Sequence, residues 1–138
     1  MPQEFSPLEG VEQLQLVSDW FGHWPIFHDA HVVEFNYLGV EDAVSFTLHA
    51  FEMTDRVDSA GYFELQKHCL VSFKLSGAVR VSFYDYQLGD TLIELQFAFD
   101  DGRVVARLES AIGGECVISA AACRVSSLIP CDGKGAPA

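Results

Sequence analysis

"TLIELQFAFDDGRVVARLE", residues 91–109, is the stretch that decides the fold. Apolar and polar residues alternate on both sides of Asp101-Gly102, which is the pattern of two half-buried strands. An Asp-Gly dipeptide between two alternating runs is the strongest short-range signal for a β-hairpin. A two-residue turn there pairs Phe99 with Val104 and keeps apolar residues opposite apolar residues along the hairpin. The centre of the chain is therefore predicted to be antiparallel sheet.

The strand before this hairpin is expected at Val79–Asp85. A five-residue loop over 86–90 would place Val81 opposite Leu95, whose partner within the hairpin is Leu108. The three strands then form a meander with one apolar face. Leu95 is expected to lie on this face between its two neighbours and to be buried.

The other face of the predicted meander is charged. Glu94 is expected directly opposite Glu109, a like-charge pair that is unfavourable unless a cation lies close to it. Arg80 and Arg107 are the cations that this register places on the diagonals. The face is interpreted either as a solvated ladder of charges or as a polar patch that contacts a partner.

Outside this region the sequence predicts one helix followed by strands. Ser6, Pro7 and Glu9 are residue types of a helix N-cap, first turn and capping box, and apolar residues recur after them at spacings of three and four. Gly22 is a suitable C-terminal stop, so we expect a helix at about 7–20. Alternation of period two marks further strands at 31–38, 44–52, 69–75 and 115–126.

These patterns predict a mainly β fold of the β-rich α+β type. We expect an antiparallel sheet of at least six strands, arranged as a sandwich or half-barrel, with one short N-terminal helix. A single domain is expected over 1–130, because a chain of 138 residues is large enough for one real hydrophobic core. The turn-rich residues 131–138 are expected to form a flexible C-terminal tail.

The chain is strongly acidic. It contains 20 Asp and Glu against 8 Lys and Arg, which gives a formal net charge of −12. Such a surface repels nucleic acid and anionic lipid and speeds encounter with a basic partner, although solubility alone is an equally simple interpretation. Because neither a membrane-spanning apolar run nor the pattern of a secretory signal is found, a cytoplasmic protein is expected.

The four cysteines include no C-x-x-C pair. Metal ligands need close spacing or a convergent fold, and a disulfide framework would imply secretion, so free thiols are expected. Cys69, Cys116 and Cys123 are expected to be buried as small hydrophobic side chains. Cys131 follows a proline in the turn-rich tail and is expected to be exposed.

Residues 21–32, "FGHWPIFHDAHV", gather three histidines around one aspartate. His28, Asp29 and His31 are metal-ligand types, but in a strand only the last two share a face, and a zinc site needs at least three protein ligands. A remote histidine would have to complete the set, and no H-E-x-x-H, H-x-H or C-x-x-C motif supports this. Motifs of the G-x-S-x-G elbow and of a phosphate-binding loop are also missing. We therefore expect no metal, no cofactor and no catalytic residues, and hence not an enzyme.

The same stretch also has a structural interpretation. A proline after Trp24 forces an extended entry into the first strand, because the residue before a proline avoids the α-helical region. The aromatic side chains would then pack the helix against the sheet, and Asp29 would accept hydrogen bonds from backbone or imidazole groups at the crossover. Partner binding is the alternative, since Trp, Tyr and Phe are the usual interface anchors. The aromatic residues concerned are Trp20, Phe21, Trp24 and Phe27.

"FGHWPIFHDAHV" resembles the segment F-G-x-W-P-x-F-H-D-A-E-V that opens the first strand in the immunity protein 50 family. Further matches follow in order over "LHAFEMTDRVDSAGYFELQKHCLVSFKLSGA" and "ESAIGGECVISAAACRV", so the resemblance covers about 15–126. The sequence departs from the pattern at His31, where the family usually has an acid, and this weakens any requirement for an acid there. The residues that match the motif core are Trp24, Pro25, Phe27, His28, Asp29 and Ala30.

The resemblance implies a bacterial cytoplasmic protein, encoded beside a polymorphic toxin, that neutralises this toxin by stoichiometric binding. The expected partner is a cognate toxin, a basic one on grounds of charge, and neither nucleic acid nor membrane. The alternative is a small cytoplasmic β-rich interaction domain with an unrelated housekeeping role. The binding residues that we expect are Trp24, Phe27, His28, Asp29, His31, Glu94 and Glu109.

Overall fold

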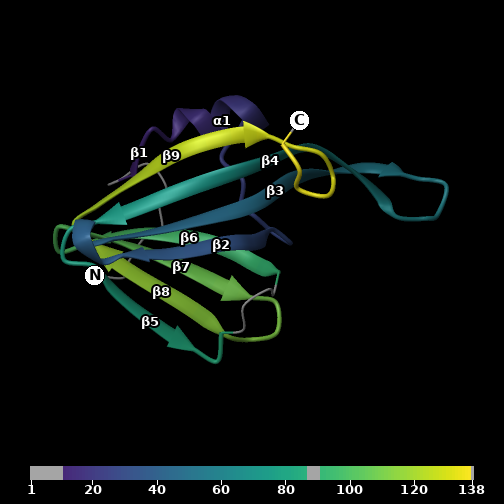
Figure 1. Cartoon of the computed structure of the whole chain (residues 1–138). Helices are drawn as coiled ribbons and strands as arrows, with labels where there is room; N and C mark the ends of the chain where they lie inside the picture. The colour runs from purple at the N-terminus through teal and green to yellow at the C-terminus, as the bar shows by residue number, and fades with distance from the viewer. Residues whose placement is uncertain (1–10, 87–90, 138) are drawn as a thin grey trace.

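The computed structural model describes residues 11–86 and 91–137, and it consists mainly of β-strands (Figure 1). One short helix and one 3-10 turn accompany the strands. The mainly β fold with a short N-terminal helix is thus confirmed. The elements are β1 Val11–Glu12, α1 Gln15–Phe21, β2 His31–Leu38, η1 Gly39–Glu41, β3 Ala43–Val57, β4 Phe63–Ser76, β5 Arg80–Tyr84, β6 Leu92–Asp100, β7 Arg103–Ser110, β8 Glu115–Ala120 and β9 Ala122–Pro130.

The strands form two sheets that share one hydrophobic core. The five-stranded sheet has the order β1-β9-β4-β3-β2, and the four-stranded sheet has the order β5-β8-β7-β6. All the strand pairs are antiparallel except β1 with β9. The expected sandwich is therefore built from one mixed sheet and one antiparallel sheet.

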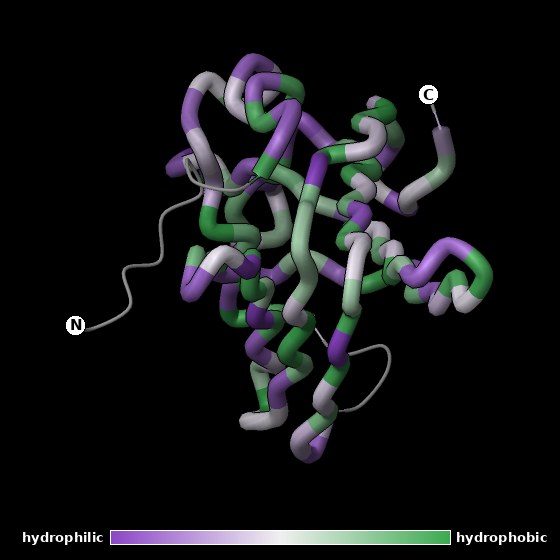
Figure 2. Tube along the Cα trace, turned by 90° about the vertical axis from the view of Figure 1, so that its left-hand side faces the viewer, coloured by the Kyte–Doolittle hydropathy of each residue, from purple (hydrophilic) through white to green (hydrophobic). Residues whose placement is uncertain are grey.

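The core contains alternate residues of both sheets. Hydrophobic and hydrophilic positions alternate along much of the chain in Figure 2, as expected for strands with one buried face. Phe73 of β4 stacks on Phe46 of β3 with ring centroids 5.2 Å apart, and it also contacts Phe97 of β6 at 5.5 Å. Because both sheets contribute to this cluster, the two sheets bury each other's apolar faces.

The Asp-Gly hairpin has the predicted register. Phe99 pairs with Val104, and the pairing continues without a shift as far as Glu94. Asp101 and Gly102 have φ angles of 52° and 75°, which is the left-handed backbone that a two-residue hairpin turn of this type requires. The sequence pattern and the turn residues here agree with the structure.

The predicted meander is wrong. β5 pairs with β8, where Val81 lies opposite Ile118, and the order of the sheet puts β5 and β6 at opposite edges. Apolar matching did not distinguish the two neighbours, because Ile118 is as good a partner for Val81 as Leu95 is. Leu95 is buried and lies beside Leu108, as predicted, but not beside Val81. The predicted single strand 115–126 is in fact two strands, β8 and β9, in different sheets.

The like-charge pair is present, but its compensation differs from the prediction. Glu94 lies opposite Glu109. Arg80 is on β5 at the far edge of the sheet, so it does not neutralise this pair. Arg107 does: its Nη2 lies 3.1 Å from Glu109 Oε1, and its Nε lies 3.8 Å from Glu115 Oε2.

The helix is shorter than predicted. It begins at Gln15 instead of residue 7, and Val11 and Glu12 form a strand that pairs with β9. The capping signals at residues 6–9 lie outside the described residues. Gly22 ends the helix with φ 82°, as expected for a left-handed C-terminal stop. The apolar spacing therefore marked a buried face correctly while overstating the length of the helix.

The cysteines are free and buried. Burial raises the pKa of Cys69, Cys116 and Cys123 to about 12, so these thiols stay protonated and unreactive. The expectation of an exposed Cys131 is wrong, because its N–H donates to His68 O and the residues that follow fold back to bridge it with Pro137. Within the two described ranges, no helix is long and apolar enough to span a membrane.

Candidate functional site

The stretch 26–31 joins the two sheets. Its backbone runs along the free edge of β6, where the Leu95 N–H donates to Ile26 O at 3.0 Å and the Asp29 N–H donates to Leu92 O at 2.8 Å. The Leu92 N–H in turn donates to Ala30 O at 2.9 Å. At residue 31 the chain enters β2 of the other sheet. The segment therefore covers one sheet edge and leads into β2, the edge strand of the other sheet.

Two residues of this segment have a left-handed backbone. Phe27 and Asp29 have φ angles of 63° and 64°. Aspartate is one of the few residue types that tolerates this region, whereas for a bulky residue it costs about 1–2 kcal/mol. The Phe27 ring is 3% exposed and lies against Trp24 and Phe73, with centroids 5.7 and 5.9 Å away. Burial of this ring offsets the backbone strain.

The predicted aromatic packing is confirmed. Phe21 and Phe27 are buried, and Trp20 and Trp24 are partly buried against the core. The Trp20 indole N–H donates to Lys67 O at 2.8 Å, which ties the helix to β4. Four aromatic residues, Trp20, Phe21, Trp24 and Phe27, thus have structural roles.

The polar groups of the stretch are more open. His28 Nε2 lies 3.6 Å from Asp29 Oδ2, and both side chains are substantially exposed. His28 Nδ1 lies 3.0 Å from Ile93 O, so it is the imidazole that bonds to the edge of β6. We expected the Asp29 carboxylate to accept a hydrogen bond from the backbone, but among the described residues no backbone N–H donates to it. The Asp29 N–H donates to Leu92 O instead. These two side chains are available for contact with a partner.

His49 and His68 form a hydrogen-bonded pair next to the end of this stretch. His31 is opposite His49, and His49 Nε2 lies 3.0 Å from His68 Nδ1. One imidazole must accept in this bond, so at least one of the pair is neutral. Burial lowers the pKa of His49, and His68 and His31 act in the same direction, while Asp132 opposes them. In the described part of the chain, no three His, Cys, Asp or Glu side chains are arranged to hold a metal ion.

The sequence analysis missed a projecting arm. β3 and β4 were expected to end at Glu52 and to begin at Cys69, but both continue and form a two-stranded ribbon over 51–67 beyond the neighbouring strands (Figure 1). We call this ribbon the arm. Its tip is closed by Asp58, whose carboxylate accepts from the N–H groups of residues 60 and 62. The missed signal was the continued alternation in "FEM" at 51–53 and "FEL" at 63–65.

One face of the arm is apolar and open. Met53 pairs with Leu65 and Val57 pairs with Phe63, and cross-strand partners share a face. Phe63 and Leu65 are two residues apart, so all four side chains lie on the same face. Each is between 42% and 57% exposed. We call these four residues the apolar face of the arm.

The opposite face of the arm is closed by polar contacts. Arg56 Nε lies 3.3 Å from Glu64 Oε2, and the Gln66 amide donates to Glu52. Lys67 Nζ lies 3.8 Å from Glu52 Oε2. These side chains partner each other, whereas the apolar face has no covering layer in the described part of the chain.

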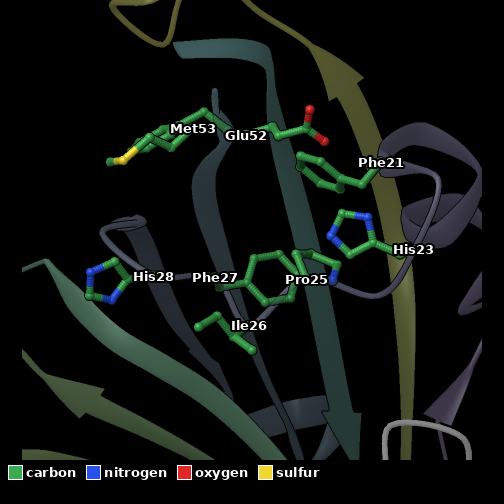
Figure 3. Close-up of a pocket in the computed structure, with 9 residues that line it drawn as sticks. Phe21, His23, Pro25, Ile26, Phe27, His28, Glu52 and Met53 are labelled. Carbon is green, nitrogen blue, oxygen red and sulfur yellow. The ribbon is translucent and has the colours of Figure 1, made fainter. Parts of the chain in front are cut away.

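Three hollows are lined by parts of the stretch 23–33; the arm also lines the first two, and β6 also lines the third. The first measures about 470 Å³, and Figure 3 shows Met53 and Glu52 of the arm across from Ile26, Phe27 and His28. The second, about 520 Å³, shares Phe51 with the first, and the third, about 190 Å³, shares Ile26 with it. We call the three together the arm groove.

The structure brings most of the predicted binding residues together. Asp29 and His31 line the second hollow, and Glu94 lines the third. Glu109 lies apart from the groove, in a separate hollow with Glu115. The predicted residues that line the groove are Trp24, Phe27, His28, Asp29, His31 and Glu94.

Comparison of the chain with protein-family models, with curated proteins and with solved structures found no match in any of the three.

Proposed function

We propose that this protein is an immunity protein that neutralises a cognate bacterial toxin by binding it stoichiometrically. The observation that carries the proposal is the apolar face of the arm, Met53, Val57, Phe63 and Leu65, which is exposed on an acidic protein. Single exposed apolar residues are ordinary, but a contiguous apolar face marks a contact surface.

Energetics favour a role in binding. Full burial of a side chain such as Leu, Met or Phe stabilises by about 1.5–3 kcal/mol relative to exposure. The arm's apolar side chains remain about half exposed, so much of this free energy is still available to an interface. A partner that covers the apolar face would gain it.

Charge and sequence motif support the same proposal. A net charge of −12 speeds association with a basic protein, which suits a basic toxin in the cytoplasm. The motif resemblance points to toxin immunity. In this fold the motif residues form the surface next to the arm, because Phe27 is buried while the side chains of His28 and Asp29 are exposed.

An alternative is a β-rich cytoplasmic interaction domain with an unrelated housekeeping role. The apolar face of the arm fits this function too, because exposed Met, Phe and Leu side chains do not specify which protein covers them. The genes beside the coding gene separate the two, since a toxin gene is expected only for an immunity protein.

Co-purification tests the proposal. The chain, carrying an affinity tag, is co-expressed with the product of the neighbouring gene, and the eluate is analysed by gel filtration and mass. We expect an equimolar complex and rescue of cells from the toxin. A toxin from an unrelated locus serves as the control and should not co-purify. The proposal fails if no neighbouring product binds and none is neutralised.

A further inference from the structure

We infer that the arm groove is the surface that binds the partner, and that the partner presents a protruding apolar side chain flanked by Lys or Arg. The inference rests on the proposed function and adds the location of the interface and the chemistry of the occupant. It is argued from the lining, the rigidity and the charge of the groove.

The lining of the first hollow suits an apolar anchor. Pro25, Ile26 and Phe27 lie on one side, and Met53 lies on the other (Figure 3). Phe51 also lines this hollow. A hollow of about 470 Å³ has room for a large aromatic or aliphatic side chain. Anchors of this kind, inserted in a pocket next to further apolar contact area, carry most of the free energy of protein interfaces. The apolar face of the arm supplies that area.

One wall of the groove is held in place before a partner arrives. On one side, the backbone around Ile26 and Asp29 is bonded to the edge of β6, and the Phe27 ring is locked in the core. On the other side, the ion pair between Arg56 and Glu64 on the back of the arm is exposed and adds little rigidity. A preformed site loses little conformational entropy on binding.

Charge selects the partner. Asp29, Glu52 and Glu94 each line one of the three hollows. Lys67 lies near Glu52, and Lys134 lines the second hollow together with Asp29, whereas Glu94 in the third hollow makes no ion pair among the described residues. A second copy of this chain also has a net charge of −12 and is therefore a poor occupant. A basic protein is favoured by the carboxylate of Glu94 and by the net charge of the whole chain.

Matched aspartate substitutions test the inference. Ile26→Asp and Phe63→Asp alter side chains of the groove and arm that are 60% and 54% exposed. Ile112→Asp, in the turn between β7 and β8, and Phe99→Asp, near the end of β6, alter side chains that do not line the groove and have similar exposure, 65% and 45%. The Kd for the purified toxin from the neighbouring gene is measured by calorimetry, and thermal unfolding of each variant checks the fold.

We expect the two groove variants to weaken binding at least about 30-fold, as loss of a hot spot does, and the controls to stay within about 3-fold of the wild type. Two groove variants that melt like the wild type and bind like it would overturn the groove while leaving the toxin-binding function intact. Equal weakening by the control substitutions would overturn it as well. Absence of a complex with the wild-type chain would instead refute the proposed function, and the groove with it.

Discussion

The hairpin of β3 and β4 has two halves with the same sequence pattern and opposite environments. In the half within the sheet, Phe46 pairs with Phe73 and Leu48 with Val71, and all four side chains are fully buried. In the arm, after register shifts between Ala50 and Glu52 and between Met53 and Val57, apolar side chains pair again, and these stand about half exposed. The first half has a second sheet packed on it, and the second half has none among the described residues. Alternation therefore indicates that one face of a strand becomes buried, but it does not indicate whether the same chain or a partner protein buries it.

The largest expected effect comes from truncating one phenylalanine in each half. Phe73→Ala removes a fully buried ring that contacts three others, and should lower the free energy of unfolding by about 3–5 kcal/mol. Phe63→Ala removes a ring that is half exposed and should cost less than about 1 kcal/mol. Urea denaturation of both variants measures this. Similar losses at the two positions would mean that the arm is part of the core.

The next effect concerns the segment 26–31 next to the arm. Asp29→Val places a β-branched residue at a φ of 64° and should destabilise by about 1–2 kcal/mol. Asp29→Asn and Asp29→Gly keep a residue type that tolerates this backbone, and should stay within about 0.5 kcal/mol of the wild type. Thermal unfolding distinguishes the variants. A loss in Asp29→Asn as large as that in Asp29→Val would show that the carboxylate, not the backbone, matters for folding.

A smaller effect of pH is expected at the boundary between the halves, where His49 contacts His68. Burial lowers the pKa of His49 below the ordinary histidine value of about 6.5. Above that pH both the folded and the unfolded state hold this imidazole neutral, so stability does not depend on it. As the pH falls below about 6.5 the unfolded chain binds the proton first, and the free energy of unfolding decreases until the pH passes the folded pKa.

Denaturation curves between pH 8 and pH 5 measure this dependence. His49→Gln should flatten the curve in this window. A curve for His49→Gln as steep as that of the wild type would assign the dependence to other groups.

The smallest effect is electrostatic and compares the two ends of β3. Asp55→Lys on the arm should lower the association rate constant for a basic toxin several-fold, with little change in dissociation. Glu41→Lys, at the η1 turn beyond the opposite end of this strand, should change it less. Raising the salt should slow association of the wild type, because charges are screened over about 8–10 Å at physiological ionic strength. If the association rate constant measured by stopped flow does not depend on salt, the net charge serves solubility and not association.

The sequence predicted the local strands and turns well, but it predicted poorly which strands pair with each other. The hairpin at Asp101-Gly102 was predictable down to its register, because a two-residue turn fixes which residues face each other. The neighbour of β5 was not, since Val81 matches the apolar residues of several strands and the choice depends on the whole sheet. Burial of Cys131 depends on a turn of the last residues that their composition alone does not reveal.

The candidate site was predicted in part. The stretch 21–32 was correctly expected to hold the aromatic packing, because Trp and Phe beside a proline leave few other arrangements. That Glu94 would line the same groove depends on the backbone pairing of Ile26 with Leu95, between segments about seventy residues apart in the sequence. The arm escaped prediction because its strand pattern looks the same with and without a covering layer.

Hydrogen exchange of the free chain and of the complex with the neighbouring toxin tests the central claim most directly, since it reports on both halves of the hairpin in one measurement. The account predicts that backbone amides at 44–50 and 69–75 are protected in both states. Those at 51–57 and 63–67 should exchange faster in the free chain and become protected in the complex. Protection that appears elsewhere, for example along the edge strand β5, with no change in the arm, would contradict the account.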